Sequence, residues 1–93
     1  MKQAVLTQTL AGNYTAFTFT HEGRDFFVKN FTTGDIYVSF NSNPSQSDDN
    51  AYRIGAGFGE EITIPLALGA KSKTIHVKGT GSVQVEQLDG WEV

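Results

Sequence analysis

Apolar and polar side chains alternate with a period of two along most of the chain, which is typical of β-strands with one face buried. No stretch keeps an apolar period of 3.6 residues long enough for a helix, and no internal repeat is present. Segments rich in Gly, Asn, Asp and Ser interrupt the alternation at the spacing expected of a sandwich, barrel or jelly roll. The predicted strands cover residues 3–10, 14–20, 26–29, 36–40, 51–54, 60–66, 73–78 and 82–88.

The alternation is clearest at residues 26–40, which we predict to form a central β-hairpin. Phe26 and Val28 share one face of its first arm, with Phe27 and Lys29 on the other. Ile36, Val38 and Phe40 share one face of its second arm. Asn30 and Thr32-Thr33-Gly34-Asp35 supply the turn between the arms, with Gly34 suited to a positive φ.

The other strands each have one apolar face, and several turns connect them. We predict turns at residues 21–24 and around Gly55, Gly57 and Gly59, and a tight reversal at Gly79-Thr80-Gly81. The polar segment 41–50 is a loop that crosses between sheets or projects as a tip. The pairs or triplets that share one strand face are Phe17 and Phe19; Tyr52 and Ile54; Ile62, Ile64 and Leu66; Ile75 and Val77; and Val83 and Val85.

These patterns predict an all-β fold, a compact β-sandwich or jelly-roll-like barrel of about seven to eight short antiparallel strands. Its 93 residues form one domain, 1–93, and 39% of them are hydrophobic, enough for one modest core. The chain has no cysteine, so its stability comes from packing or from association with copies or partners.

The charge distribution argues against two classes of partner. The net charge is −3 and the seven basic residues are dispersed, whereas nucleic-acid binding needs a concentrated basic surface. No apolar run reaches the roughly 20 residues that span a bilayer. Residues 1–7 lack the apolar core of a signal peptide, so we expect synthesis in the cytoplasm.

Candidate metal ligands do not converge in the sequence. His21 lies in a predicted turn and His76 on an outward strand face, and neither belongs to the His-x-His pattern of cupin-type metal sites. Both are interpreted as surface residues. Asp48-Asp49 in the polar loop offers oxygens that suit calcium, but it matches no known calcium loop, and a solvated tip is the simpler interpretation. We predict no metal and no cofactor.

Catalytic patterns are also missing from the sequence. Glu60 and Glu61 are neighbours in a strand and point to opposite faces, so they cannot flank one glycosidic bond. The glycines at 55, 57 and 59 are followed by two acidic residues, which disfavour phosphate, so they indicate a bend rather than a nucleotide loop. We predict no catalytic residues and no enzyme activity.

Aromatic residues are the remaining candidates for binding or for an interface. Tyr14, Tyr37, Tyr52 and Trp91 could form such a surface, since exposed Tyr and Trp mark binding sites. In the alternative interpretation, Tyr37 and Tyr52 cover the outside of a sheet as cross-strand partners. Trp91 follows Gly90 in the terminal segment and would either pack back on the domain or dock into a neighbour.

Three segments resemble small virion proteins of tailed bacteriophages and prophages. They are Phe27-Val28-Lys29-Asn30 leading to Gly34-Asp35-Ile36-Tyr37-Val38-Ser39, then 59–65, and last 75–88, with its Gly79-Thr80-Gly81 hairpin and Val83-Gln84-Val85 strand. The Asp48-Asp49 loop and the Trp91 segment depart from this pattern.

The resemblance implies a compact β-sandwich that decorates a capsid, forms a head fibre or joins a tail. From it we expect a non-enzymatic structural protein that self-associates and docks on a capsid or tail lattice. Its partners would be other virion proteins and copies of itself, and its location the virion after synthesis in the host cytoplasm. A carbohydrate- or ligand-binding β-sandwich module is the alternative, with a host-surface glycan as a candidate ligand.

Overall fold

Eight β-strands form the secondary structure of the residues that this computed structural model describes, which are 5–40, 51–64 and 71–89. The described residues contain no helix, so none could cross a membrane as one. In chain order the strands are β1 Val5–Ala11, β2 Thr15–Gly23, β3 Asp25–Asn30, β4 Ile36–Ser39, β5 Tyr52–Ile54, β6 Gly59–Thr63, β7 Ser72–Lys78 and β8 Thr80–Gln87.

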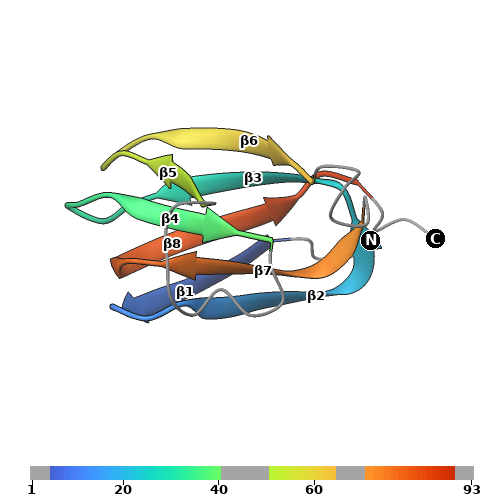
Figure 1. Ribbon diagram of the computed structural model, residues 1–93, viewed down its shortest axis with the longest axis horizontal. Helices are drawn as coiled ribbons and strands as arrows, with labels where there is room; N and C mark the ends of the chain where they lie inside the picture. The colour runs from blue at the N-terminus through green and yellow to red at the C-terminus, as the bar shows by residue number, and fades with distance from the viewer. Residues whose placement is uncertain (1–4, 41–50, 65–70, 90–93) are drawn as a thin grey trace.

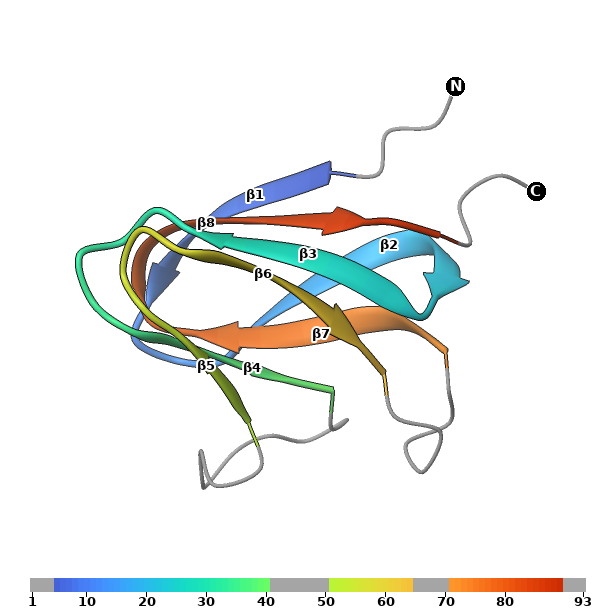
Figure 2. The same ribbon diagram turned by 90° about the horizontal axis from the view of Figure 1, so that it is seen from above.

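The strands form two antiparallel sheets that pack face to face (Figures 1 and 2). Sheet A has the order β1-β8-β3-β6, and sheet B has the order β2-β7-β4-β5. The pairs are nested: β1 pairs with β8, β2 with β7, β3 with β6 and β4 with β5. A long antiparallel ribbon of this kind, folded over itself so that β8 meets β3 and β7 meets β4, is a jelly roll. The predicted all-β sandwich of seven to eight antiparallel strands is therefore confirmed, and its strand order is that of a jelly roll.

One apolar core lies between the sheets, and its members alternate along each strand as the sequence predicted. Phe26 and Val28 of sheet A and Ile75 and Val77 of sheet B are each 0% exposed. Leu6 and Phe40 pack against the edge of this core. The remaining buried members are Leu10, Phe17, Phe19, Ile36, Val38, Ile54, Ile62, Ile64, Val83 and Val85.

The hairpin predicted for residues 26–40 is wrong, because β3 and β4 lie in different sheets. Their connection is an arch that carries the chain across the core. The apolar faces were assigned correctly, and they look the same in a hairpin and in an arch, since both bury alternate side chains. Gly34 does not have the predicted positive φ; among the described glycines, Gly12, Gly57 and Gly81 do.

The predicted Gly79-Thr80-Gly81 hairpin is wrong for the same reason. The chain at this reversal passes from β7 in sheet B to β8 in sheet A, and those two strands do not pair with each other. By contrast β4 and β5 pair within sheet B, so the prediction that 41–50 crosses between sheets does not hold. Residues 41–50 themselves lie outside the described residues.

Several strand ends differ from the prediction. β2 continues through the predicted 21–24 turn as far as Gly23, with a register irregularity after Thr18. β6 ends at Thr63, and Ile64 is buried beyond it, whereas the predicted inward Leu66 lies outside the described residues. Ile54 is buried, but Tyr52, predicted to share its face, is 41% exposed at the sheet edge.

Four connections between the sheets lie at one end of the sandwich, whereas the β2–β3 connection at Arg24 crosses at the other end. The β1–β2, β3–β4, β5–β6 and β7–β8 connections all lie at the left in Figure 2. We call this the turn end. Segments that are distant in sequence, such as 31–35 and 55–58, meet there.

Candidate interaction surface

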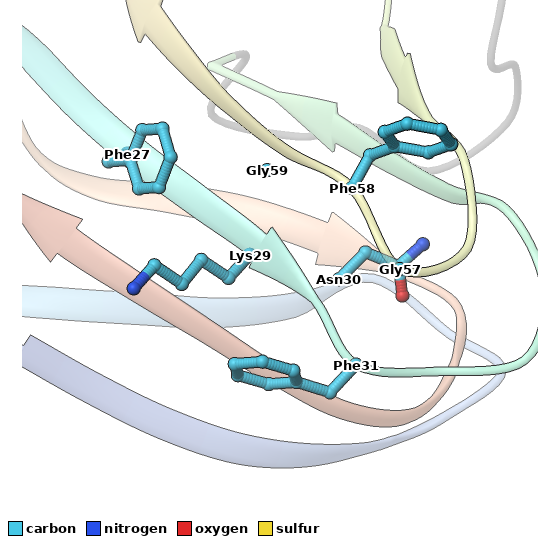
Figure 3. Close-up of a pocket in the computed structure, with 7 residues that line it drawn as sticks. All are labelled: Phe27, Lys29, Asn30, Phe31, Gly57, Phe58 and Gly59. Carbon is cyan, nitrogen blue, oxygen red and sulfur yellow. The ribbon is translucent and has the colours of Figure 1, made fainter.

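Exposed phenylalanine side chains mark the turn end of sheet A. Phe31 is 58% exposed and Phe58 is 69% exposed, values unusual for side chains with no polar group. With the half-buried Phe27 they border a hollow of about 230 Å³ (Figure 3). We call Phe27, Phe31 and Phe58 the phenylalanine cluster. Lys29, Asn30, Gly57 and Gly59 complete the lining.

Backbone hydrogen bonds from β3 fix the two turns that carry the exposed rings. The Asn30 N–H donates to the Phe58 carbonyl at 2.9 Å, and the Gly57 N–H donates to the Asn30 carbonyl at 3.0 Å. The Phe31 N–H donates to the Ser82 carbonyl at 3.1 Å. These hydrogen bonds fix the backbone that carries the Phe31 and Phe58 rings.

The buried Asn30 side chain closes the arch between β3 and β4. Its Nδ2 donates to the carbonyls of Gly34 at 2.9 Å and Ile54 at 3.0 Å. Its Oδ1 accepts from the Thr32 backbone N–H at 2.8 Å and lies 2.6 Å from the Thr32 Oγ1. That hydroxyl also lies 2.7 Å from the Gly34 carbonyl, and its one proton can serve only one acceptor at a time. Asn30 is therefore bonded on both sides and joins the 31–35 turn to β5.

Two glycines shape the hollow. Gly57 has a φ of 79°, a left-handed conformation that other residues adopt only with strain, and this turns the chain so that Phe58 stands outward. A Cβ on Gly59 would lie 3.0 Å from the Phe27 ring. The absence of a side chain at Gly59 thus lets the Phe27 ring lie close to the backbone of β6.

A second aromatic group lies on sheet B. The Lys78 amine is 5.5 Å from the centre of the Tyr14 ring and 5.7 Å from that of Tyr37, distances typical of cation–π contacts. Tyr37 and Lys78 are also direct cross-strand partners. Beside them a hollow of about 370 Å³ is lined by Tyr37, Lys78, Asp35 and residues of three turns, Gly12, Thr32, Thr33, Gly34, Gly79 and Thr80.

The structure therefore brings together two of the four aromatic residues that the sequence singled out, Tyr14 and Tyr37. Tyr52 lies apart from them, with its ring edge-on to Phe40 at 6.1 Å between centroids. Trp91 lies outside the described residues. The phenylalanine cluster was not predicted, although a large apolar residue inside a turn of Asn, Thr and Gly residues, as at Phe31 and Phe58, is a readable signal.

The predicted positions of Glu60, Glu61 and His76 agree with the strand register, whereas His21, predicted in a turn, lies in β2. Glu60 pairs with Val28 and Glu61 with Phe27, so the two carboxylates point to opposite faces. His76 pairs with Ala16 and Ser39 on the outer face of sheet B. Within 5–40, 51–64 and 71–89, no three His, Cys, Asp or Glu residues are grouped to hold a metal ion. The Asp48-Asp49 candidate for calcium lies outside these ranges.

Comparisons of the chain with known protein families, with curated proteins and with solved structures found no match.

Proposed function

We propose that this protein is a non-enzymatic structural component of a phage or prophage particle, which self-associates and docks on a capsid or tail lattice. The observation that carries the proposal is the phenylalanine cluster at the turn end of sheet A. The particle itself is suggested by the resemblance of residues 27–39, 59–65 and 75–88 to small virion proteins. In this proposal the protein reaches the virion after synthesis in the host cytoplasm.

The cluster favours a protein partner over a small polar ligand. Full burial of a Phe side chain is worth about 1.5–3 kcal/mol, so covering Phe31 and Phe58 would supply a few kcal/mol of association energy. Phenylalanine has no hydroxyl or N–H to hydrogen-bond a sugar, whereas rigid aromatic side chains are typical anchors at protein interfaces. Exposed apolar side chains gathered at one place on a small domain are characteristic of an interaction site.

The fold is compatible with this role without determining it. Jelly rolls occur in viral capsid proteins and in lectins, and one fold can serve unrelated functions. A cysteine-free domain of 93 residues also gains stability when it buries exposed apolar side chains against further copies.

A carbohydrate-binding module is the second candidate, and the hollow beside Tyr37 favours it. An aromatic ring, a carboxylate and an amine line that hollow as Tyr37, Asp35 and Lys78. Sugars are commonly bound by such a combination of an aromatic surface with hydrogen-bonding groups. The Lys78 amine already lies over the rings of Tyr14 and Tyr37, however, so a sugar would have to compete for those surfaces.

Sedimentation velocity with a Phe31→Ser, Phe58→Ser double variant tests the leading proposal. The unmodified protein should form species heavier than one chain, and the double variant should stay monomeric at the same concentrations. Thr33→Ser is the matched control, since Thr33 is an exposed residue of the same arch. An unmodified protein that remains monomeric, or a double variant that assembles as well as the unmodified protein, would contradict the proposal.

A further inference from the structure

The outer faces of the two sheets carry opposite charge. On sheet A, the register places Glu61 and Glu86 on either side of Phe27. Asp25 and Lys29 lie on the same face, so three carboxylates accompany one amine. An aromatic ring between two carboxylates thus forms the middle of this face.

The outer face of sheet B carries basic side chains, in contrast to the carboxylates of sheet A. One row of cross-strand partners runs from Lys78 through Tyr37 to Arg53, and the Tyr14 ring flanks Lys78. His76 belongs to the next row. Among the described strand residues of sheet B, Glu22 in the irregular last part of β2 is the one acidic residue. Asp35, in the adjoining turn, lies 3.8 Å from Arg53.

The aromatic side chains of the two faces lie toward the same end of the sandwich. Phe31 and Phe58 are in the arch and in the β5–β6 connection, both at the turn end. Tyr14 lies just after the β1–β2 turn, and Tyr37 lies near the start of β4, which begins at that end. A face of sheet A laid on a face of sheet B could thus bring aromatic side chains together while carboxylates meet amines and guanidinium groups.

We propose that copies of this chain assemble by placing the outer face of sheet A of one copy on the outer face of sheet B of the next. The inference rests on the self-association proposed above and assigns its partner, a second copy of this chain. Phe27, Phe31 and Phe58 face Tyr14 and Tyr37 across the contact. Glu61 and Glu86, which flank Phe27, lie opposite Lys78 and Arg53, which flank Tyr37. Aromatic contacts combined with complementary charges are common at protein interfaces.

The dimensions of the molecule allow such a contact. The sandwich measures 36 × 28 × 18 Å, and its broad faces are the two sheets (Figure 1). A face of this outline can accommodate the roughly 800 Å² per partner that a standard interface buries. Since the two contacting faces differ, the contact is heterologous, and it generates either a closed ring or a continuing stack rather than a two-fold dimer.

Charge reversal on one face at a time tests this arrangement. The Glu61→Lys, Glu86→Lys variant makes both faces basic, and the Lys78→Glu, Arg53→Glu variant makes both acidic. Each variant alone should associate at least about tenfold more weakly than the unmodified protein, since like charges then meet. An equimolar mixture should restore assembly, because every contact between the two variants pairs opposite charges.

The readout is the mass by light scattering of each variant alone and of the mixture, with circular dichroism to confirm folding. Glu22→Lys is the matched control, a charge reversal at an exposed residue in the irregular last part of β2, and it should assemble normally. If a double variant misfolds, the same two residues are replaced by Gln instead. These neutral variants should lose less of the association than the charge reversals.

The outcomes separate the two proposals. Assembly of the mixture but not of either variant supports the stacking of sheet A on sheet B. Assembly of either double variant alone at the level of the unmodified protein overturns the stacking but leaves self-association standing. Failure of the mixture of folded variants to assemble also overturns it. An unmodified protein that stays monomeric throughout overturns the self-association on which the inference rests.

Discussion

Replacing Asn30 with Ala should destabilise the fold more than replacing any exposed residue of the same arch. Asn30 is 1% exposed, and its side chain bonds to Gly34, Ile54 and Thr32. In the alanine variant, the Thr32 hydroxyl can still donate to the Gly34 carbonyl at 2.7 Å. The Ile54 carbonyl and the Thr32 backbone N–H lose their hydrogen bonds to the Asn30 side chain.

The expected loss follows from those two groups. A buried polar group left without a partner costs about 1–3 kcal/mol. Two such groups, partly relieved by water reaching the arch, give a decrease of about 3 kcal/mol in the free energy of unfolding. This is a large fraction of the 5–15 kcal/mol typical of a domain, and for a chain of this size it corresponds to a melting temperature lower by roughly 12–24 °C.

Urea unfolding followed by circular dichroism measures this loss. Thr33→Ala is the control, because Thr33 is exposed in the same arch and its replacement should change the free energy by less than about 0.5 kcal/mol. Asn30→Asp should be at least as damaging as Asn30→Ala, since it exchanges the two donors for an acceptor facing two carbonyls. A loss below about 1 kcal/mol for Asn30→Ala, with an unchanged dependence on urea, would refute the role assigned to this side chain.

Three further predictions concern other parts of the chain. Gly23→Ala should cost about 2 kcal/mol in urea unfolding, because the new Cβ would lie 2.7 Å from the Gln87 Nε2 and 2.8 Å from the Asp89 carbonyl; unchanged stability would show that these groups move aside freely. Asp89→Ala should cost about 1–2 kcal/mol, since the Asp89 Oδ1 accepts from the backbone N–H groups of Arg24 at 2.9 Å and Asp25 at 3.0 Å. Asp89→Asn keeps that acceptor and should lose less, and equal losses for the two variants would count against the hydrogen bonds as the cause. Titration with a panel of glycans should leave the fluorescence of Trp91, the single tryptophan, unchanged, whereas a saturable change with one glycan would favour the carbohydrate-binding alternative.

The faces of the strands could be predicted from the sequence, but the partners of the strands could not. Alternation places Phe26 and Val28, or Ile75 and Val77, on the buried side whichever sheet their strand joins. Whether residues 31–35 form a hairpin turn or an arch depends instead on tertiary contacts, above all on the Asn30 side chain reaching Ile54 in β5. The sequence alone does not place those segments next to each other.

The candidate surface could be predicted only in part. The sequence indicates Tyr14 and Tyr37 as surface aromatic candidates, and in the structure both rings lie next to Lys78. The sequence pattern does not indicate Phe31 and Phe58, because they stand in turns, where the period-two alternation that identifies strand faces does not apply. Their proximity arises because the Asn30 backbone bonds to both Phe58 and Gly57.

The solution mass of the unmodified protein, measured by light scattering after size exclusion over a hundredfold range of concentration, tests the central claim of self-association most directly. The chain has a mass of 10.1 kDa. The proposal predicts species of several times this mass, with a heterologous contact giving a closed ring of defined size or a series that lengthens with concentration. A constant mass of one chain at every concentration would contradict self-association.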